Sequence, residues 1–188
     1  MKVAFLGDSL TFGFGLHMKE KWPYIIGQEK GWEIINAGIS GDTSGGNLSR
    51  LKEVLDQKPD VLFIMTGGND FVAGCGTETV KANVISICQQ SAAQGIRIYV
   101  ASETKSIPSE VSESWKAIAD FDEFNKKQEE MSIWYERYCR AFSFNYVNVF
   151  KEYSEATGDG TEVSQDGIHP NEKGARILAD IIGNHIKV

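Results

Sequence analysis

Short runs of β-branched and aromatic residues alternate with longer amphipathic stretches along almost the whole chain. Strands are expected at Lys2 to Leu6, Glu33 to Ala37, Val61 to Met65, Ile96 to Ala101 and Asn145 to Val149. Helices are expected at Trp22 to Glu29, Leu48 to Leu55, Thr77 to Gln94, Glu113 to Phe142 and Pro170 to Ile186. This alternation is typical of strand and helix units built around a parallel sheet. It predicts a three-layer α/β fold, with about five parallel strands and helices on both faces.

The length and composition fit one folding unit. The chain has 188 residues, of which 41% are hydrophobic and 24% charged, as in an average globular protein. Because single cores commonly reach about 100 to 200 residues, residues 1–188 are expected to form one domain. The least regular segment is Ser102 to Ser114. It is either a functional loop or lid or a mobile surface loop, and the long helical run after it is expected to bend or break.

Charge and residue usage exclude several classes of protein. A formal net charge of −7 argues against a nucleic-acid partner, which would need a positive field. The apolar run at the N-terminus is too short for a signal-peptide core or an integral membrane segment. Three cysteines without CxxC spacing suggest reduced thiols and a cytoplasmic location. Three histidines, and no phosphate-binding loop after any strand, predict neither a metal site nor a cofactor.

Four polar segments follow expected strands. They are Gly7-Asp8-Ser9-Leu10 after the first strand, Ser40-Gly41-Asp42-Thr43 after the second, Gly67-Gly68-Asn69-Asp70 after the third, and Asp166-Gly167-Ile168-His169 after the fifth. In open parallel sheets, ligands bind beyond the carboxyl ends of the strands. All four segments are therefore expected at one edge of the sheet, where they would form a site.

These four segments, in this order, resemble the four signature blocks of the GDSL, or SGNH, family of serine esterases and lipases. The resemblance spans nearly the whole chain and is greatest to small single-domain members with thioesterase, lysophospholipase and arylesterase activities. It implies a flavodoxin-like SGNH hydrolase fold and cleavage of a carboxylic ester or thioester of a small acyl substrate, without a cofactor. By resemblance, the family-defining residues would be Ser9, Gly41, Asn69 and His169, with Asp166 as the acid of a triad.

The chemistry of these residue types agrees with a catalytic triad. A serine hydroxyl is a poor nucleophile alone, and His169 could act as its base at neutral pH. Asp166, three residues before His169, could hold the imidazole Nδ1–H and stabilise the imidazolium as it forms. The alternatives are structural: Ser9 could cap a helix, and Asp166 could be a turn residue before Gly167.

A tetrahedral intermediate also needs donors directed at its oxyanion. The expected donors are the backbone N–H groups of Ser9 and Gly41 and the side-chain amide of Asn69. The alternative for Asn69 is an Asx turn after a strand. Asp8 and Asp70 flank the site and are expected to hold loops by accepting backbone N–H bonds.

Substrate contacts are expected from apolar residues near these segments. Phe12, Phe71 and Val72 are the first choices, and Phe14, Leu16, Met18, Trp115, Phe121 and Phe124 could also contribute. Packing in the core is the alternative for each of them. The leading functional hypothesis is acyl hydrolysis through an acyl-Ser9 intermediate. A non-catalytic ligand-binding domain on the same scaffold, and an acyltransferase using the same triad, are the other hypotheses.

Overall fold

Five parallel strands form one sheet in the order β2-β1-β3-β4-β5. The computed structural model describes residues 1–187. The strands are β1 (Lys2–Gly7), β2 (Glu33–Gly38), β3 (Val61–Met65), β4 (Arg97–Ala101) and β5 (Asn145–Val147). β1 and β3 lie in the middle of the sheet and are almost wholly buried, as their continuous apolar sequences require. The predicted α/β class with five parallel strands is confirmed.

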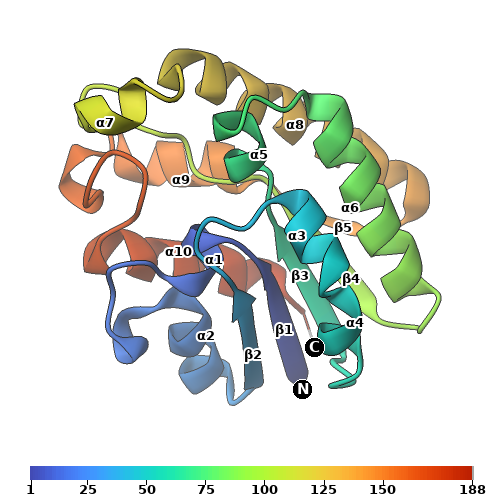
Figure 1. Cartoon of the computed structure of the whole chain (residues 1–188). Helices are drawn as coiled ribbons and strands as arrows, with labels where there is room; N and C mark the ends of the chain where they lie inside the picture. The colour runs from blue at the N-terminus through green and yellow to red at the C-terminus, as the bar shows by residue number, and fades with distance from the viewer. Residues whose placement is uncertain (188) are drawn as a thin grey trace.

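Helices cover both faces of the sheet (Figure 1). One face carries α2 (Trp22–Lys30), α9 (Val149–Thr157) and α10 (Glu172–His185). The other carries α3 (Ser44–Ser49), α4 (Leu51–Leu55), α6 (Thr77–Ala92) and α8 (Phe121–Phe142). Alternate residues of each strand point to opposite faces, so the sheet divides the interior into two apolar clusters.

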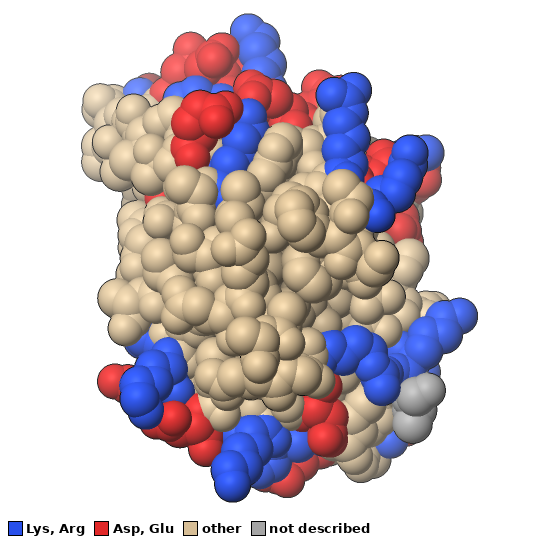
Figure 2. Space-filling view, turned by 90° about the vertical axis from the view of Figure 1, so that its right-hand side faces the viewer, with Lys and Arg blue, Asp and Glu red and all other residues tan. Residues whose placement is uncertain are grey.

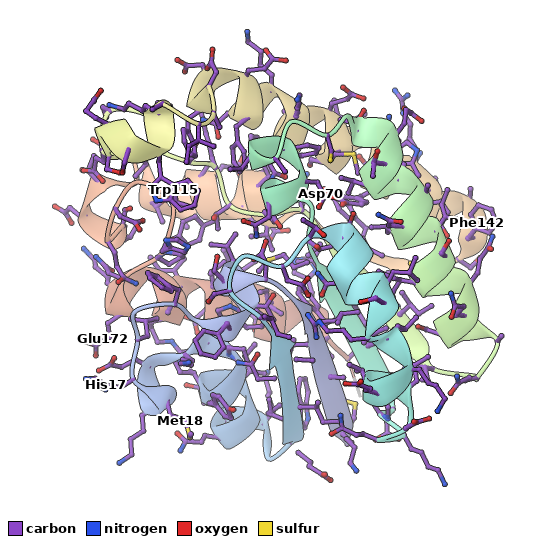
Figure 3. The ribbon with its side chains drawn as sticks, viewed as in Figure 1. His17, Met18, Asp70, Trp115, Phe142 and Glu172 are labelled. Carbon is purple, nitrogen blue, oxygen red and sulfur yellow. The ribbon has the colours of Figure 1, made fainter. Side chains whose placement is uncertain are left out.

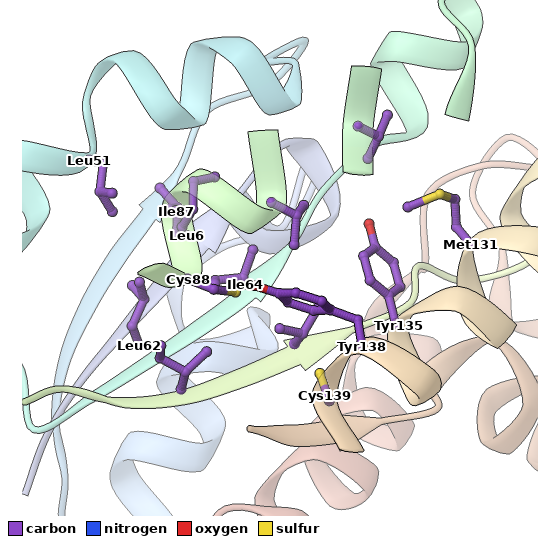
Figure 4. Close-up of a cluster of buried hydrophobic side chains, with 14 of the residues drawn as sticks. Leu6, Leu51, Leu62, Ile64, Ile87, Cys88, Met131, Tyr135, Tyr138 and Cys139 are labelled. Carbon is purple, nitrogen blue, oxygen red and sulfur yellow. The ribbon is translucent and has the colours of Figure 1, made fainter. Parts of the chain in front are cut away.

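The two clusters are of similar size. Val3 and Phe5 of β1 pack with Trp22 of α2 in the first cluster. The second cluster is shown in Figure 4, with side chains from β1, β3, α4, α6 and α8: Leu6, Leu51, Leu62, Ile64, Ile87, Cys88, Met131, Tyr135, Tyr138 and Cys139. Burial of this apolar surface, at about 25 cal/mol per Å², is the main force that holds the helices against the sheet.

Five short elements complete the chain: α1 (Ser9–Phe12), η1 (Met18–Glu20), α5 (Gly68–Val72), α7 (Glu113–Lys116) and η2 (Thr161–Val163). The space-filling view in Figure 2 shows that Lys, Arg, Asp and Glu gather at the upper and lower edges of one face and are sparse at its centre. No helix within residues 1–187 combines the length and the apolar character needed to cross a bilayer.

Helix caps explain where the boundaries differ from the expected ones. The fifth strand ends at Val147 because Asn148 caps α9, a helix the sequence pattern did not indicate. The helical run expected from residue 113 to residue 142 is divided at residues 117–120, and Asp120 caps α8 by accepting the N–H groups of Asp122 and Glu123.

Two other helices also begin away from their expected start. The final helix begins at Glu172 instead of Pro170, because the Asn171 side chain accepts the Gly174 N–H. The helix expected from residue 48 begins at residue 44, where the Thr43 side chain caps it, and it is interrupted at residue 50. In each case a short polar side chain that accepts a backbone N–H fixes the start of the helix.

Candidate active site

Ser9 follows the interior strand β1 at the carboxyl edge of the sheet, as the first residue of α1. The turn before it is tight. A Cβ at Gly7 would lie 2.2 Å from the Thr11 hydroxyl oxygen and 2.3 Å from the Met65 carbonyl oxygen, so only glycine fits. Asp8 then caps α1, because its Oδ1 accepts the Leu10 N–H at 2.9 Å. These constraints fix where the Ser9 hydroxyl lies.

His169 joins Ser9 and Asp166 in one chain of polar contacts. Its Nε2 lies 2.9 Å from the Ser9 Oγ, and its Nδ1 lies 2.8 Å from the Asp166 Oδ2. The His169 side chain is largely buried, and the Phe14 ring packs against the imidazole at a centroid distance of 4.7 Å. The structure therefore brings together the three residues that the sequence predicts as a triad. The arrangement can move a proton from a hydroxyl to an imidazole.

The charge on Asp166 is stabilised by its own loop. Burial alone would raise the pKa of this carboxyl, but hydrogen bonds from His169 and Ile168 outweigh it and lower the pKa below its usual value. The backbone N–H groups of His169 and Ile168 reach the Oδ1 atom at 2.8 and 3.0 Å. Asp166 is therefore ionised at neutral pH and can accept from the imidazole Nδ1–H.

The backbone around residues 164–170 holds this loop rigidly. Gly167 has a φ of +82°, and a Cβ there would lie 2.7 Å from the Ile107 carbonyl oxygen. The Ile107 N–H in turn donates to the Gly167 carbonyl at 2.7 Å. Ser164 pairs with Pro170 in an isolated antiparallel bridge. The segment from 102 to 114, which the sequence left open as a lid or a mobile loop, is thus attached to the histidine loop at Ile107.

The three predicted oxyanion donors belong to residues that line the cavity beside Ser9. Gly41 has a φ of +81°, which glycine adopts without strain. Within residues 1–187, the backbone N–H groups of Ser9 and Gly41 donate to no other group of the protein. The Asn69 amide nitrogen donates to the Asp42 carbonyl at 2.9 Å and more weakly to the Asp8 Oδ2 at 3.2 Å. The predicted oxyanion donors all border one cavity.

The loops that carry these donors are tied to one another. Asp70 accepts the Ser44 backbone N–H and its hydroxyl, both at 2.7 Å, in the loop-holding role expected for it (Figure 3). Arg50 pairs with Asp42 at 2.7 Å and donates to the Gly7 carbonyl at 2.9 Å. Because these bonds link loops from three different strands, the donors keep fixed relative positions.

A cavity of about 320 Å³ opens beside Ser9, His169 and Asn69. Its apolar walls come from Leu10, Phe14, Val72, Trp115, Phe121, Phe124 and Ile168. Trp115 belongs to α7, at the top left of Figure 3. This volume and apolar lining suit a small acyl or aryl group.

The three residues named first as substrate contacts lie in different places. Val72 lines the cavity. Phe12 does not; it is 40% exposed, and the Lys21 ammonium lies 3.5 Å from its ring centroid. Phe71 does not line the cavity either, because it packs in the core, with its ring at 77° to the Phe124 ring.

One polar residue of the cavity was missed. Glu103 follows β4, is 1% exposed, and borders the cavity together with Ser9 and Asn69. The rule that places sites beyond the carboxyl ends of strands applies to the fourth strand as well and would have found it. No sequence pattern indicated that its neighbour Gln128, from the middle of α8, would lie near the site. In the described part of the chain, no group of three or more His, Cys, Asp or Glu is arranged to hold a metal ion.

Comparisons with known proteins agree with this geometry. The model of the GDSL-like lipase/acylhydrolase family matches residues 5–177. An arylesterase of Vibrio mimicus is 26% identical over 195 residues, covering 98% of this chain and 88% of its own length. The thioesterase 1/protease 1/lysophospholipase L1 of Escherichia coli K12 is 26% identical over 190 residues, covering 98% and 83%. A lipolytic G-D-S-L protein of Veillonella parvula has a similar fold, with a TM-score of 0.81 at 21% identity over 96% of this chain and 94% of its own.

Proposed function

The chain belongs to the GDSL-like lipase/acylhydrolase family, and on that premise we propose that it hydrolyses a carboxylic ester or thioester of a small acyl substrate through an acyl-Ser9 intermediate. The observation that carries this proposal is the contact series from Asp166 through His169 to Ser9, at 2.8 and 2.9 Å, beside an apolar cavity. Each residue of the series has the chemistry that its step requires.

Acylation begins when the substrate carbonyl carbon enters the cavity beside Ser9. His169 Nε2 takes the hydroxyl proton as the Ser9 Oγ forms a bond to that carbon. The resulting imidazolium is stabilised by ionised Asp166, which also keeps the proton on Nδ1. As the tetrahedral intermediate collapses, His169 gives the proton to the leaving oxygen or sulfur, and the acyl group remains on Ser9.

Deacylation repeats these steps with water. His169 accepts a proton from the attacking water, and the second intermediate collapses to release the carboxylic acid and restore the Ser9 hydroxyl. In both intermediates, the negative oxygen is stabilised by the N–H groups of Ser9 and Gly41 and by the Asn69 amide. The whole cycle uses groups of the protein and needs no cofactor.

The substrate is a small molecule with an uncharged acyl or aryl group. The walls of the cavity are mostly aliphatic and aromatic, and its charged residues lie among the polar groups around Ser9. A cavity of this kind favours apolar groups, since each methylene removed from water contributes about 0.8 kcal/mol. The relatives named arylesterase and thioesterase agree with such a substrate class.

Transfer of the acyl group to an alcohol is a second activity that the same residues could support. An acyltransferase would use the same triad with an alcohol in place of water, and product analysis with added alcohol separates it from a hydrolase. A non-catalytic binding domain is not favoured, because the hydroxyl, imidazole and carboxylate are connected by hydrogen bonds.

Cys75, Cys88 and Cys139 are all unpaired, which favours a reducing compartment such as the cytoplasm.

The test is hydrolysis of p-nitrophenyl acetate and longer acyl esters by wild type, Ser9→Ala and Ser86→Ala. Ser86 is the matched control, because its hydroxyl donates to the Ala82 carbonyl within α6. Mass spectrometry of fluorophosphonate-treated protein locates the reactive serine. We expect hydrolysis and a label at Ser9 in wild type and Ser86→Ala, and neither in Ser9→Ala. Wild type that neither hydrolyses esters nor carries a label at Ser9 would overturn the proposal.

A further inference from the structure

Glu103 is a buried carboxyl that the triad does not use. It is 1% exposed, its Oε2 accepts a hydrogen bond from the Gln128 side-chain amide, and the Gly68 N–H donates to the same carboxyl group. A Cβ at Gly68 would lie 2.4 Å from this oxygen, so glycine is required for the backbone to approach the carboxyl. Gly68 directly precedes Asn69, and Glu103 is thereby bonded to the segment that carries the amide donor.

The second oxygen of Glu103 differs from the first. Oε1 is buried and receives no hydrogen bond from any donor in residues 1–187. Asp8, 2% exposed, lines the same cavity as Glu103, and the two carboxyls are close enough to shift each other's pKa. Across the described residues, neither of these two carboxyls pairs with a Lys or Arg. Two adjoining carboxylates without a cation, both removed from water, cannot both be ionised, so the pair keeps a proton.

Hydrogen bonds decide where that proton resides. The two Asp8 oxygens accept N–H groups, Oδ1 from Leu10 at 2.9 Å and Oδ2 from Asn69 at 3.2 Å, and these bonds favour the ionised form. Glu103 Oε1 has no such donor among the described residues, and it gains a partner when it carries the proton itself. A proton on Glu103 Oε1 therefore leaves no buried oxygen of the pair without a partner.

The pKa directions agree with this placement. Burial, strengthened by the Asp8 charge, raises the pKa of Glu103 well above its usual range. Burial raises the pKa of Asp8 only to about 6, because the bonds from Leu10 and Glu103 oppose it. Among the other titratable groups, His169 and Asp42 act on Asp8, and the Glu103 charge helps to raise the pKa of the Tyr135 phenol.

We propose that Glu103 is a positioning residue: its neutral carboxyl donates from Oε1 to the Asp8 carboxylate, and Asp8 in turn orients the Asn69 amide toward the oxyanion. This inference rests on the proposed function, in which Asn69 stabilises the tetrahedral intermediates. Asn69 is anchored on its other side by the Asp42 carbonyl at 2.9 Å.

The proton on Glu103 also affects how strongly Asp8 competes with the oxyanion for the Asn69 hydrogen. A carboxylate that accepts an O–H bond is a weaker acceptor for its remaining donors. Asn69 can therefore shift its longer bond from Asp8 to the oxyanion when the intermediate forms. An ionised Glu103 would instead add a second negative charge next to the developing one. The effect belongs to the transition state, so it changes kcat more than KM.

The experiment compares Glu103→Gln with Glu103→Leu. Glutamine reproduces the neutral acid: its carbonyl can accept from Gln128 and Gly68, and its amide can donate to Asp8. Leucine fills a similar volume and donates nothing. We expect Glu103→Gln to keep kcat within a few-fold of wild type, and Glu103→Leu to lower kcat by about 10- to 100-fold with little change in KM.

Further measurements separate positioning from folding. In an Asn69→Ala background, Glu103→Leu should lower kcat little further, because the donor it orients is gone. Ser91→Ala, which removes a buried hydroxyl on α6 bonded to the Ile87 carbonyl, is the control for a buried polar change. Infrared spectra at pH 8 should contain the carbonyl stretch of a neutral carboxylic acid in wild type, and this band should be lost in Glu103→Gln.

The inference is overturned if Glu103→Gln loses as much activity as Glu103→Leu, if Glu103→Leu equals wild type, or if the infrared band is absent. These results differ from a failure of the proposed function, in which wild type neither hydrolyses esters nor is labelled at Ser9. In that case the positioning role fails as well, while the infrared band still reports whether Glu103 holds the proton, because that measurement needs no activity.

Discussion

The Oγ atom of Ser9 lies 2.9 Å from the Nε2 atom of His169, although 160 residues separate them along the chain. The sheet makes this contact possible. Ser9 lies just beyond the end of the interior strand β1, and the loop of His169 returns to the same edge after the last strand. A contact this close requires both loops to be fixed, and the catalytic predictions below depend on it.

Ser9→Ala and His169→Ala are each expected to lower kcat for p-nitrophenyl acetate by about 10⁴-fold or more, because nucleophile and base act as one unit. For the same reason, the double variant should be no slower than either single one. Steady-state kinetics measures the losses, and far-ultraviolet circular dichroism checks that each variant is folded. Losses that multiply in the double variant would show that the two residues act independently.

The central part of this site could be predicted from the sequence because it depends on local signals. Ser9, Asn69 and Gly41 each follow an apolar strand directly, and strands of a parallel sheet end at a common edge. His169 lies farther along the chain, after α9 and η2, and its segment was indicated by the resemblance to the fourth signature block of the family. For Ser9, Gly41 and Asn69, knowing which segment follows which strand was sufficient to predict that they lie close together, since the sheet itself brings the segments together.

Other parts depend on long-range packing or on competing caps, which no local pattern reveals. Glu103 and Gln128 meet only because α8 packs over the end of β4. Phe71 lies one residue before Val72, yet the helical turn of α5 directs Phe71 into the core and Val72 to the cavity. Near Pro170, two features each favour the start of a helix: a proline at the first helical position and the Asn171 side chain as a cap. The Asn171 cap prevailed because the preceding residues pair in a bridge.

Asn69→Ala is expected to lower kcat by about 100- to 1,000-fold, the usual cost of losing one oxyanion donor. KM should change much less, because the bond is strongest in the transition state. The matched control is Asn83→Ala, which removes a partly buried amide that donates to the Ser44 hydroxyl and does not border the cavity. Equal losses in the two variants would point to a structural role for Asn69.

Asp166→Asn is expected to lower kcat by about 10⁴-fold, since an amide cannot hold the imidazole in the required tautomer. It should also change the response of stability to acid. The pKa of Asp166 lies below its ordinary value of 3.8 in the folded chain. Its ionised form therefore stabilises the fold above that pH, and the contribution is lost as the pH falls through the lowered pKa.

Urea unfolding at several pH values measures this contribution. Wild type should exceed Asp166→Asn in unfolding free energy by a constant amount from pH 6 to pH 8, and the excess should shrink below about pH 4. The excess will be small, because the Asp166 side chain is 39% exposed and solvent screens its charge. An excess that grows in acid would contradict the assigned direction of the pKa shift.

Val72→Phe is expected to shift the acyl-chain preference toward shorter esters. The larger side chain occupies part of the 320 Å³ cavity, and each methylene it excludes loses about 0.8 kcal/mol, or roughly four-fold in kcat/KM. The ratio of kcat/KM for acetate to that for longer esters measures the shift. Ile133→Phe, at an exposed position of α8, should leave the ratio unchanged. An unchanged ratio in Val72→Phe would place the acyl group elsewhere.

Glu103→Gln is expected to make the protein more stable than wild type at pH 8 and about equally stable at pH 4. Burial raises the folded-state pKa of Glu103 well above its ordinary value of 4.5. As the pH rises past 4.5, the unfolded chain loses this proton while the folded chain retains it, so ionisation favours the unfolded state and wild-type stability falls. Glutamine does not ionise in either state, and the variant avoids this loss.

Urea unfolding of wild type and Glu103→Gln at pH 4, 6 and 8 measures the difference in unfolding free energy between them. Asp8, whose pKa is also raised by burial, contributes to both proteins, so most of its effect cancels in the comparison. The control is Glu129→Gln, at an exposed carboxylate of α8, where no pH-dependent difference is expected. A Glu103→Gln difference that stays constant from pH 4 to pH 8 would mean that Glu103 is ionised in the folded protein. The Asp8 carboxylate would then have no acid beside it to donate a hydrogen bond.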